Sequence, residues 1–222
     1  MDRITIREEQ VKVLLDTPFV RVYDLQYAEG RHYYDASRRK MEDLCAIKTD
    51  EEFKALKPDG VNCIVIVREK GKEAKLLFTR EYRFPTGRFI LNPPAGMVDK
   101  EDYETKEPML SAAKREIKEE TGLTVKDTDR IFIAAPLLFS TPGLTDECNC
   151  IVCAVVDVED LSELTNAGAE DTEVFDGFAL IGMEEAKKLI RTGCDEHGIP
   201  VTATLWAMLM YFIGGLWMEE LQ

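Results

Sequence analysis

Three glutamates near the middle of the chain could bind a metal ion together. In the segment PMLSAAKREIKEETGL, Glu116 precedes Glu119 and Glu120 by three and four residues, and residues at these spacings are neighbours on a helix. Converging carboxylates repel one another, but hard divalent cations such as Mg²⁺ bind carboxylate oxygens and keep several waters. The spacing therefore indicates a cation site. The alternative is a solvated helix face on which neighbouring basic residues dilute the charge.

The segment from Pro108 to Leu123 has the start and stop signals of a short helix. Proline suits a first helical position, where its missing N–H would have no partner, and Gly122 suits the left-handed residue that closes a helix. Met109, Ala113 and Ile117 recur at the spacing of one helical face, so this face should pack on a core. The glutamates would then lie beside the buried face.

The run from Gly96 to Leu123 resembles the signature of the Nudix hydrolases, usually written G-x5-E-x7-R-E-U-x-E-E-x-G-U with U an aliphatic residue. From Glu107 onward every fixed position matches, through Arg115 and the glutamates to the closing glycine. The departure lies upstream, because ten residues rather than five separate Gly96 from Glu107. This apparent insertion within residues 97–106 leaves the shape of the loop before the helix open.

The resemblance implies roles for these residues and a fold. Glu116, Glu119 and Glu120 would ligate the divalent ion, Mg²⁺ or alternatively Mn²⁺, while Arg115 and Glu107 would orient this cage. The implied fold class is α+β: an α/β/α sandwich around a mixed central sheet, the Nudix fold, with a small N-terminal antiparallel β-sheet added.

Length and charge restrict the function further. The 222 residues can bury a full core and are long for the catalytic fold alone, so one domain with an appendage is expected. A net charge of -14 would repel a phosphate backbone, which argues against nucleic-acid binding. The first residues lack the basic and apolar regions of a secretory signal, and the cytoplasm is therefore the expected location.

Residues 1–56 read as an N-terminal sheet region with a connector. Short apolar alternations such as VKVLLD and FVRVYDLQYA are separated by turn residues, which is typical of antiparallel strands. The ADP-ribose pyrophosphatases, a branch of the Nudix hydrolases, carry such a sheet and often use it to form an intertwined homodimer. Resemblance to this branch therefore implies dimerisation through 1–56, with 57–222 as the Nudix domain ending in a helix.

The stretch REYRFPTGRFILNPPAG holds the expected substrate contacts upstream of the helix. Its arginines could compensate a diphosphate, and Tyr82-Arg83 matches the position of a substrate-contacting arginine in ADP-ribose pyrophosphatases. Resemblance also implies that the Ala95 carbonyl ligates metal. Asn92 departs from the pattern, because a glutamate is usual there, and one acidic contact is missing at this position.

Two loops after the helix complete the resemblance to ADP-ribose pyrophosphatases. Pro142-Gly143 followed by Glu147 is similar to their S-P-G-x-x-x-E loop and implies a substrate contact at Glu147. In the same branch a mobile loop supplies the general base, and the acidic stretch LTNAGAEDTEVFD offers Glu170 first and Glu173 second. A plain turn and a solvated acidic loop are the respective alternatives.

Two further segments have structural rather than functional interpretations. Cys150-x-x-Cys153 could be half of a zinc site, but strand alternation would point the two thiols to opposite faces, so reduced buried thiols are expected. Residues 201–218 carry no charge and reach the lower limit for a membrane span. Their threonines, glycines and lack of a basic flank favour a buried terminal helix and no membrane partner.

These features together predict metal-dependent hydrolysis of the diphosphate linkage in a nucleoside diphosphate derivative. ADP-ribose, giving AMP and ribose 5-phosphate, is the first candidate by resemblance. The alternatives are another nucleotide sugar, a dinucleotide, or a Nudix domain that binds a nucleotide as a regulator without turnover. The expected partners are a small nucleotide and a second copy of the chain.

Overall fold

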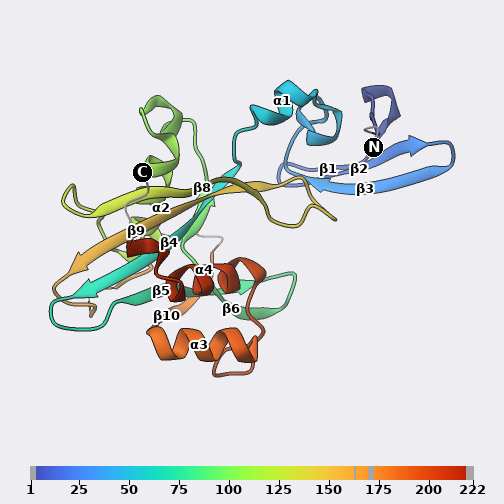
Figure 1. Ribbon diagram of the computed structural model, residues 1–222. Helices are drawn as coiled ribbons and strands as arrows, with labels where there is room; N and C mark the ends of the chain where they lie inside the picture. Colours follow the sequence, from blue (N-terminus) through green and yellow to red (C-terminus); the bar gives the residue numbers. More distant parts are fainter. Residues whose placement is uncertain (1–3, 163, 170–172, 219–222) are drawn as a thin grey trace. The chain divides into compact units, whose positions relative to one another are not determined.

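The computed structural model describes residues 4–162, 164–169 and 173–218 (Figure 1). The chain divides into two compact units, and each is described here by itself. The first unit contains residues 1–59 together with 137–149, and the second contains residues 60–136 and 150–222. The segment 137–149 therefore belongs with the N-terminal part of the chain, although it includes the end of one strand and the start of the next strand of the large sheet described below.

A three-stranded antiparallel sheet forms the centre of the first unit. Its strands are β1 (Val11–Asp16), β2 (Arg21–Ala28) and β3 (Arg31–Ser37), in that order across the sheet. This is the small sheet that the apolar alternations predicted. Tyr23, Leu25 and Leu44 form its core. The connector that follows contains the 3₁₀ turns Met41–Asp43 and Cys45–Ile47 and the short helix α1 (Asp50–Lys54).

The second unit is built on a mixed seven-stranded sheet. The strands are β4 (Gly60–Glu69), β5 (Lys75–Arg83), β6 (Arg88–Asn92), β7 (Ala95–Met97), β8 (Arg130–Phe139), β9 (Cys148–Val158) and β10 (Phe175–Ile181). The main order is β10-β5-β4-β9-β8, with β6 paired to β5 and β7 paired to β4. Strands β4 and β5 pair as an antiparallel hairpin around the charged turn at residues 70–74.

Helices cover both faces of this sheet. Along β4 the side chains alternate: Ile64 and Ile66 pack with helices α3 (Met183–Thr192) and α4 (Ala203–Ile213), whereas Cys63 and Val65 pack with helix α2 (Pro108–Thr121). The result is an α/β/α sandwich, and the expected fold class is confirmed.

The cysteine pair on β9 follows the same alternation. Cys153 lies in the core under α3 and α4, while Cys150 lies in the core under α2. The two thiols therefore point to opposite faces of the sheet, as the sequence predicted, and the six cysteines are free thiols.

The uncharged C-terminal segment folds as a short buried helix. Helix α4 has 11 residues, begins after the Thr202 cap, and buries Leu205, Met208, Leu209 and Phe212. A 3₁₀ turn at Leu216–Met218 follows it. Within the described part of the chain, no helix combines the length and hydropathy that a membrane crossing requires.

Candidate active site

Helix α2 carries the three glutamates and is fixed at both ends as its sequence predicts. Pro108 occupies the first turn, and Gly122 closes the helix with a φ of 75°, a conformation that glycine adopts without steric cost. Ala112, Ala113 and Ile117 are buried in the core of the second unit. This anchoring holds the glutamate side of the helix against strand β7.

Glu116 lies directly over Gly96. The Glu116 carboxylate is nearly buried, and a Cβ on Gly96 would collide with it. Arg115 donates from Nη1 to Glu116 Oε1 at 2.6 Å and to Glu119 Oε2 at 3.2 Å. A glycine is therefore needed at 96 so that the glutamate can lie in this place, and one guanidinium bridges two carboxylates of the helix.

Glu120 is the most deeply buried carboxylate of the three. It is 3% exposed, and Oε1 accepts a hydrogen bond from the Ala95 N–H at 3.0 Å. Its second oxygen, Oε2, is buried and has no hydrogen-bond partner among the described residues. A carboxylate oxygen left in this state is costly, so a bound cation would satisfy it.

Burial raises the pKa of two of these carboxyls. The pKa of Glu120 rises to about 9, mainly because burial penalises its charged form, although the Ala95 N–H opposes the shift. The pKa of Glu116 rises to about 7, also through burial, and the Arg115 charge opposes that shift. A divalent cation bound beside them would favour the charged forms of both carboxyls and so offset the effect of burial.

The donor set fits a hard divalent cation, although the carboxylates are not yet gathered around one point. Across the described ranges, no group of three acidic, histidine or cysteine side chains already has the geometry of a metal site. Arg115 instead pairs with the carboxylates of Glu116 and Glu119. An ion at Glu120 would require one or both to turn away from this guanidinium.

Asp102 is a further contact of Arg115, and sequence reasoning missed it. Asp102 is buried in a 3₁₀ turn (Asp102–Glu104), where Oδ2 accepts from Arg115 Nη2 at 3.1 Å and from the Asp99 N–H, and Oδ1 accepts from Ser111 Oγ. These bonds outweigh burial and lower the pKa of Asp102. Asp102 therefore holds the guanidinium beside the helix as an ionised partner.

Glu107 lies away from these contacts. It is the exposed residue just before the first turn of α2, and its side chain does not cap the helix. In the described part of the chain, no hydrogen bond or ion pair joins Glu107 to Arg115. The orienting role expected for Glu107 stays untested, and the geometry gives that contact to Asp102.

The acidic loop before β10 is attached to the C-terminal turns of α2. Asn166 Nδ2 donates to the Glu120 carbonyl, the Thr165 N–H donates to the Thr121 carbonyl at 3.1 Å, and Gly168 lies against the Glu119 backbone. Glu173 follows on this loop, and its charge contributes to the raised pKa values of Glu116 and Glu120. Glu170, the first candidate base, lies outside the described residues.

Arg83 pairs with Glu81, a carboxylate on its own strand β5. Its Nη2 is 2.7 Å from Glu81 Oε2, and that same oxygen accepts from Asn92 Nδ2 at 3.0 Å. Glu81 is buried and contributes to the raised pKa of Glu120. Arg80 faces the opposite side of β5, where Asp195 and Glu196 pair with its guanidinium.

Residues 56–198, which include all of these side chains, match the NUDIX domain family. The chain belongs to the Nudix family. A Caenorhabditis elegans protein named as a nudix hydrolase is 36% identical over 158 residues, which are 68% of this chain and 64% of that protein. An ADP-ribose pyrophosphatase of Saccharomyces cerevisiae is 31% identical over 153 residues, or 67% of this chain and 60% of the yeast protein. The chain thus spans under two thirds of the length of both relatives.

Among solved structures, the fold is similar to a Caenorhabditis elegans Ap4A hydrolase binary complex. The TM-score is 0.46 at 19% sequence identity, and the match covers 71% of this chain and 97% of that one.

The Nudix signature, counted from its glycine, points to Asp102. Five residues separate Gly96 from Asp102, which is the spacing that the signature gives between its glycine and its first acid. Counting back from Arg115 leads instead to Glu107. The extra residues of this chain therefore lie after Asp102, and a count from both ends of the signature would have found it.

The first unit holds the remaining predicted contact, Glu147, on segment 137–149. Glu147 Oε2 accepts from Arg38 Nε at 3.0 Å, and the neighbouring Asp146 accepts from Ser37 Oγ and from the Cys45 N–H. The Tyr33 hydroxyl bonds the Gly143 carbonyl. The loop is thus fixed on the N-terminal sheet. The basic side chains at 38 and 39 are engaged in ion pairs with acidic residues of the same unit.

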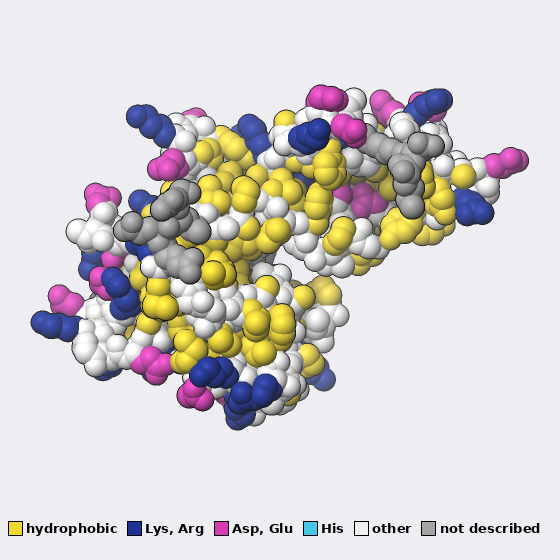
Figure 2. Space-filling view, in the orientation of Figure 1, with side chains coloured by type: hydrophobic (Ala, Val, Ile, Leu, Met, Phe, Trp, Pro, Cys, Tyr) yellow, Lys and Arg dark blue, Asp and Glu magenta, His cyan; other side chains and the backbone are white. Residues whose placement is uncertain are grey.

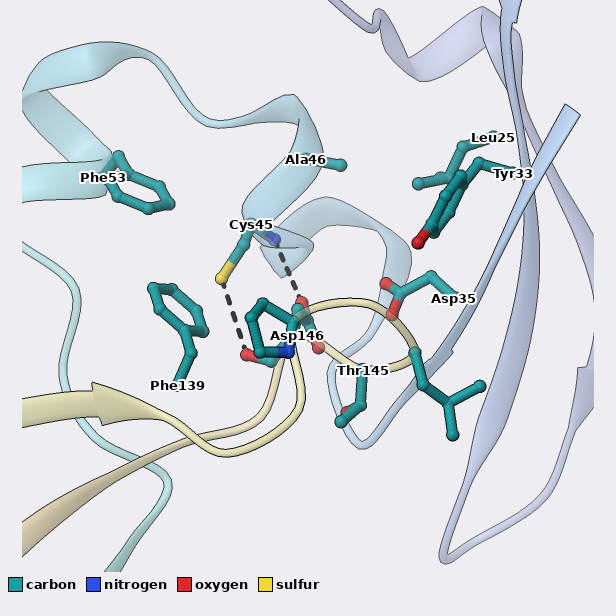
Figure 3. Close-up of a pocket in the computed structure, with 11 residues that line it drawn as sticks. Leu25, Tyr33, Asp35, Cys45, Ala46, Phe53, Phe139, Thr145 and Asp146 are labelled. Carbon is teal, nitrogen blue, oxygen red and sulfur yellow. Dashed lines mark hydrogen bonds between the residues drawn. The ribbon is translucent and has the colours of Figure 1, made fainter. Parts of the chain in front are cut away.

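A cavity of about 270 Å³ lies beside this loop in the first unit (Figure 3). The parallel rings of Phe53 and Phe139 stand on one side, and Tyr33 and Asp35 face them across the cavity. The other lining residues are Leu25, Cys45, Ala46, Pro142, Leu144, Thr145 and Asp146. Burial and the Asp146 charge raise the pKa of Asp35 to about 6.

Proposed function

We propose that this chain hydrolyses the diphosphate linkage of a nucleoside diphosphate derivative, with ADP-ribose as the first candidate and AMP and ribose 5-phosphate as products. The observation that carries the proposal is Glu120: a buried carboxylate with one unpaired oxygen, next to Glu116 on a Nudix helix. A nucleotide-binding or structural module has no need of this uncompensated acidic group, whereas a site for divalent cations does.

The Mg²⁺ or Mn²⁺ ions would be held by Glu116, Glu119 and Glu120 and by the carbonyl of Ala95. When bound, such ions neutralise phosphate charge and favour ionisation of water. The protein's own contribution to ligation is to hold Glu120 by the Ala95 N–H and to hold Arg115 by Asp102. Glu120 is thereby already oriented for an ion, and Glu116 and Glu119, which Arg115 keeps beside it, would turn from the guanidinium toward the ion.

The attacking water needs a general base, and the loop before β10 offers two glutamates. The charge of Glu173 contributes to the raised pKa values of Glu116 and Glu120, which supports a position of Glu173 within reach of the site. Glu170 remains the other candidate. This glutamate would take a proton from the water as the water oxygen bonds one phosphorus, the bridging P–O bond breaks and the other phosphate leaves. Arg83 would bind the diphosphate by neutralising charge on its oxygens.

The choice of ADP-ribose is supported by the relatives that carry this activity in their names. It is also supported by the Pro142-Gly143 and Glu147 loop. A different nucleotide sugar or a dinucleotide would use the same carboxylates, since the diphosphate is common to all of them. A regulator that binds nucleotides without turnover is the remaining alternative.

A phosphate-release screen with a coupled phosphatase tests the proposal. The panel contains ADP-ribose, other nucleotide sugars, dinucleotides and nucleoside triphosphates, each with and without Mg²⁺. We expect Mg²⁺-dependent release from ADP-ribose above the rest, and a loss of several orders of magnitude in Glu120→Gln, with the fold retained. Cleavage of another compound in the panel above ADP-ribose would change the assigned substrate and keep the proposed reaction. Nucleotide binding without any turnover would instead support the regulator.

A homodimer formed through the N-terminal sheet is part of the proposal. Strand β1 exposes Val13, Leu14 and Leu15, and β3 exposes Tyr33 and Tyr34; Figure 2 shows hydrophobic side chains gathered on this part of the molecular surface. A second copy would remove this apolar area from water. Light scattering should give twice the chain mass, and Leu14→Glu should lower it. A monomeric mass for the unaltered chain would contradict the dimer.

A further inference from the structure

Arg83 and Glu81 lie on one face of strand β5, next to the acidic group of the site. Residues two apart on a strand share a face, and Arg83 Nη2 lies 2.7 Å from Glu81 Oε2. The Arg83 side chain is 46% exposed, whereas Glu81 is buried. One donor of the guanidinium is thus anchored inside the protein, and its other N–H groups remain available on the exposed side.

Asn92 fixes the carboxylate that anchors Arg83. Its side-chain Nδ2 donates to Glu81 Oε2 at 3.0 Å, and its main-chain carbonyl accepts from Thr79 Oγ1 at 3.3 Å. Because a carboxylate only accepts hydrogen bonds, the amide nitrogen must face Glu81. Asn92 pairs with Thr79 in the β5–β6 register, so both of its bonds go to the neighbouring strand.

This arrangement also counters a repulsion between arginines. Arg83 lies directly opposite Arg88 in the β5–β6 pair, and like charges in opposite positions push each other apart. Arg88 bonds the Gly87 carbonyl. Without the Glu81 carboxylate, the Arg83 guanidinium would therefore leave this position and spread into solvent.

We propose that Glu81 is the positioning residue that fixes the Arg83 guanidinium for the substrate diphosphate, and that Asn92 orients Glu81. The inference rests on the proposed function, since it concerns the same site. The inference also explains why Asn92 can stand where a glutamate is usual. The carboxylate is supplied by Glu81 on the adjacent strand, and the Asn92 amide bonds it. A residue that acts through Arg83 should affect binding of the diphosphate more than turnover.

The test compares Glu81→Gln, Arg83→Ala and the double variant, with Glu69→Gln as a matched control in the same sheet. Glu69 pairs with Lys72 at the β4–β5 turn. Two quantities are measured: kcat and KM for ADP-ribose with Mg²⁺, and the Kd of ADP without metal by calorimetry. We expect Glu81→Gln to raise KM and Kd about tenfold, as for loss of one charged hydrogen bond, with kcat within about twofold.

The double variant separates positioning from an independent role. If Glu81 acts through Arg83, the double variant should have the same Kd for ADP as Arg83→Ala. The coupling energy of the two changes then equals the effect of Glu81→Gln alone. The inference would be overturned if the fold-changes in Kd of the two single variants multiplied in the double variant. An unchanged Kd in Glu81→Gln would also overturn it. Asn92→Leu, which keeps the shape of the side chain without its amide, should weaken ADP binding in the same direction and provides a second variant if Glu81→Gln folds poorly.

The outcome of the control experiments distinguishes this inference from the proposed function. An unaltered chain that binds ADP but cleaves no diphosphate would end the hydrolase proposal, and the Kd series would still decide the role of Glu81. If the unaltered chain cleaves ADP-ribose and Glu81→Gln has the same KM and Kd, the positioning role of Glu81 is wrong and the hydrolase proposal stands. A chain that neither cleaves nor binds would end both.

Discussion

Asp102 Oδ2 accepts a hydrogen bond from Arg115 Nη2 at 3.1 Å, and this bond connects the turn before helix α2 to the acidic group on it. The same guanidinium contacts Glu116 and Glu119 through Nη1. Arg115 therefore needs a fixed position from which to hold two carboxylates, and the buried Asp102 supplies it.

Asp102→Asn should lower Mg²⁺-dependent turnover about tenfold or more, because the guanidinium loses a charged partner and its two carboxylates lose their alignment. Glu107→Gln, on the exposed residue before the helix, should leave turnover within about twofold. Initial rates with ADP-ribose check both variants. Equal losses in the two would show that Glu107 shares the orienting role.

Gly96→Ala should reduce turnover strongly with little loss of thermal stability. The added Cβ would overlap the Glu116 carboxylate, and the flexible end of that side chain would move aside rather than the backbone. Mg²⁺ affinity, measured by calorimetry, should fall together with turnover. Gly182→Ala is the matched control, since a Cβ there meets Glu73 at 3.6 Å, an ordinary contact distance. Normal Mg²⁺ binding in Gly96→Ala would contradict the placement of Glu116.

Glu173→Gln should lower kcat about a hundredfold, the typical contribution of a general base, with little change in KM. Gly168→Ala should give a smaller loss in kcat, because a Cβ at 168 would come 3.0 Å from the Cα and carbonyl oxygen of Glu119 and push the loop outward. Single-turnover rates separate this loss from product release. An unchanged rate in Glu173→Gln would exclude Glu173 as the base and leave Glu170 as the candidate.

Asp35→Asn should change how stability depends on pH. The folded-state pKa of Asp35, about 6, lies above its ordinary value of 3.8, through burial and the Asp146 charge. The folded protein then binds more protons than the unfolded chain between these values, so the contribution of Asp35 to stability is lost as pH rises through this range. Arg39 opposes the shift.

Urea unfolding at several pH values between about 4 and 7 measures this effect. We expect the stability of Asp35→Asn relative to the unaltered chain to rise with pH over that range. The exposed Asp16→Asn is the matched control on the same sheet. A constant difference between Asp35→Asn and the unaltered chain would contradict the raised pKa.

Local signals in the sequence predicted the elements that build the site. Helix α2 begins at Pro108 and is closed by Gly122, because the fixed φ of proline suits the first turn and glycine adopts the left-handed closing conformation without steric cost. The alternation in β9 likewise placed Cys150 and Cys153 on opposite faces. These predictions succeed because a few neighbouring residues decide them.

The contacts that complete the site depend on residues far apart in the chain. Nothing local indicates that Asn166 bonds the carbonyl of Glu120, or that Ser37 bonds Asp146 across more than a hundred residues. Asp102 is an intermediate case. Its spacing from Gly96 was readable, but only its burial shows that it, and not the exposed Glu107, contacts Arg115.

The segment 137–149 leaves the second unit and returns to it, so the two units are joined by three peptide connections rather than one. Neither unit is therefore one uninterrupted stretch of the gene. A shortened chain that starts at residue 60 would keep the loop but lose Ser37, Arg38 and Cys45, which hold Asp146 and Glu147. A chimera made from this chain and a relative must accordingly take the N-terminal sheet and the segment 137–149 from the same protein.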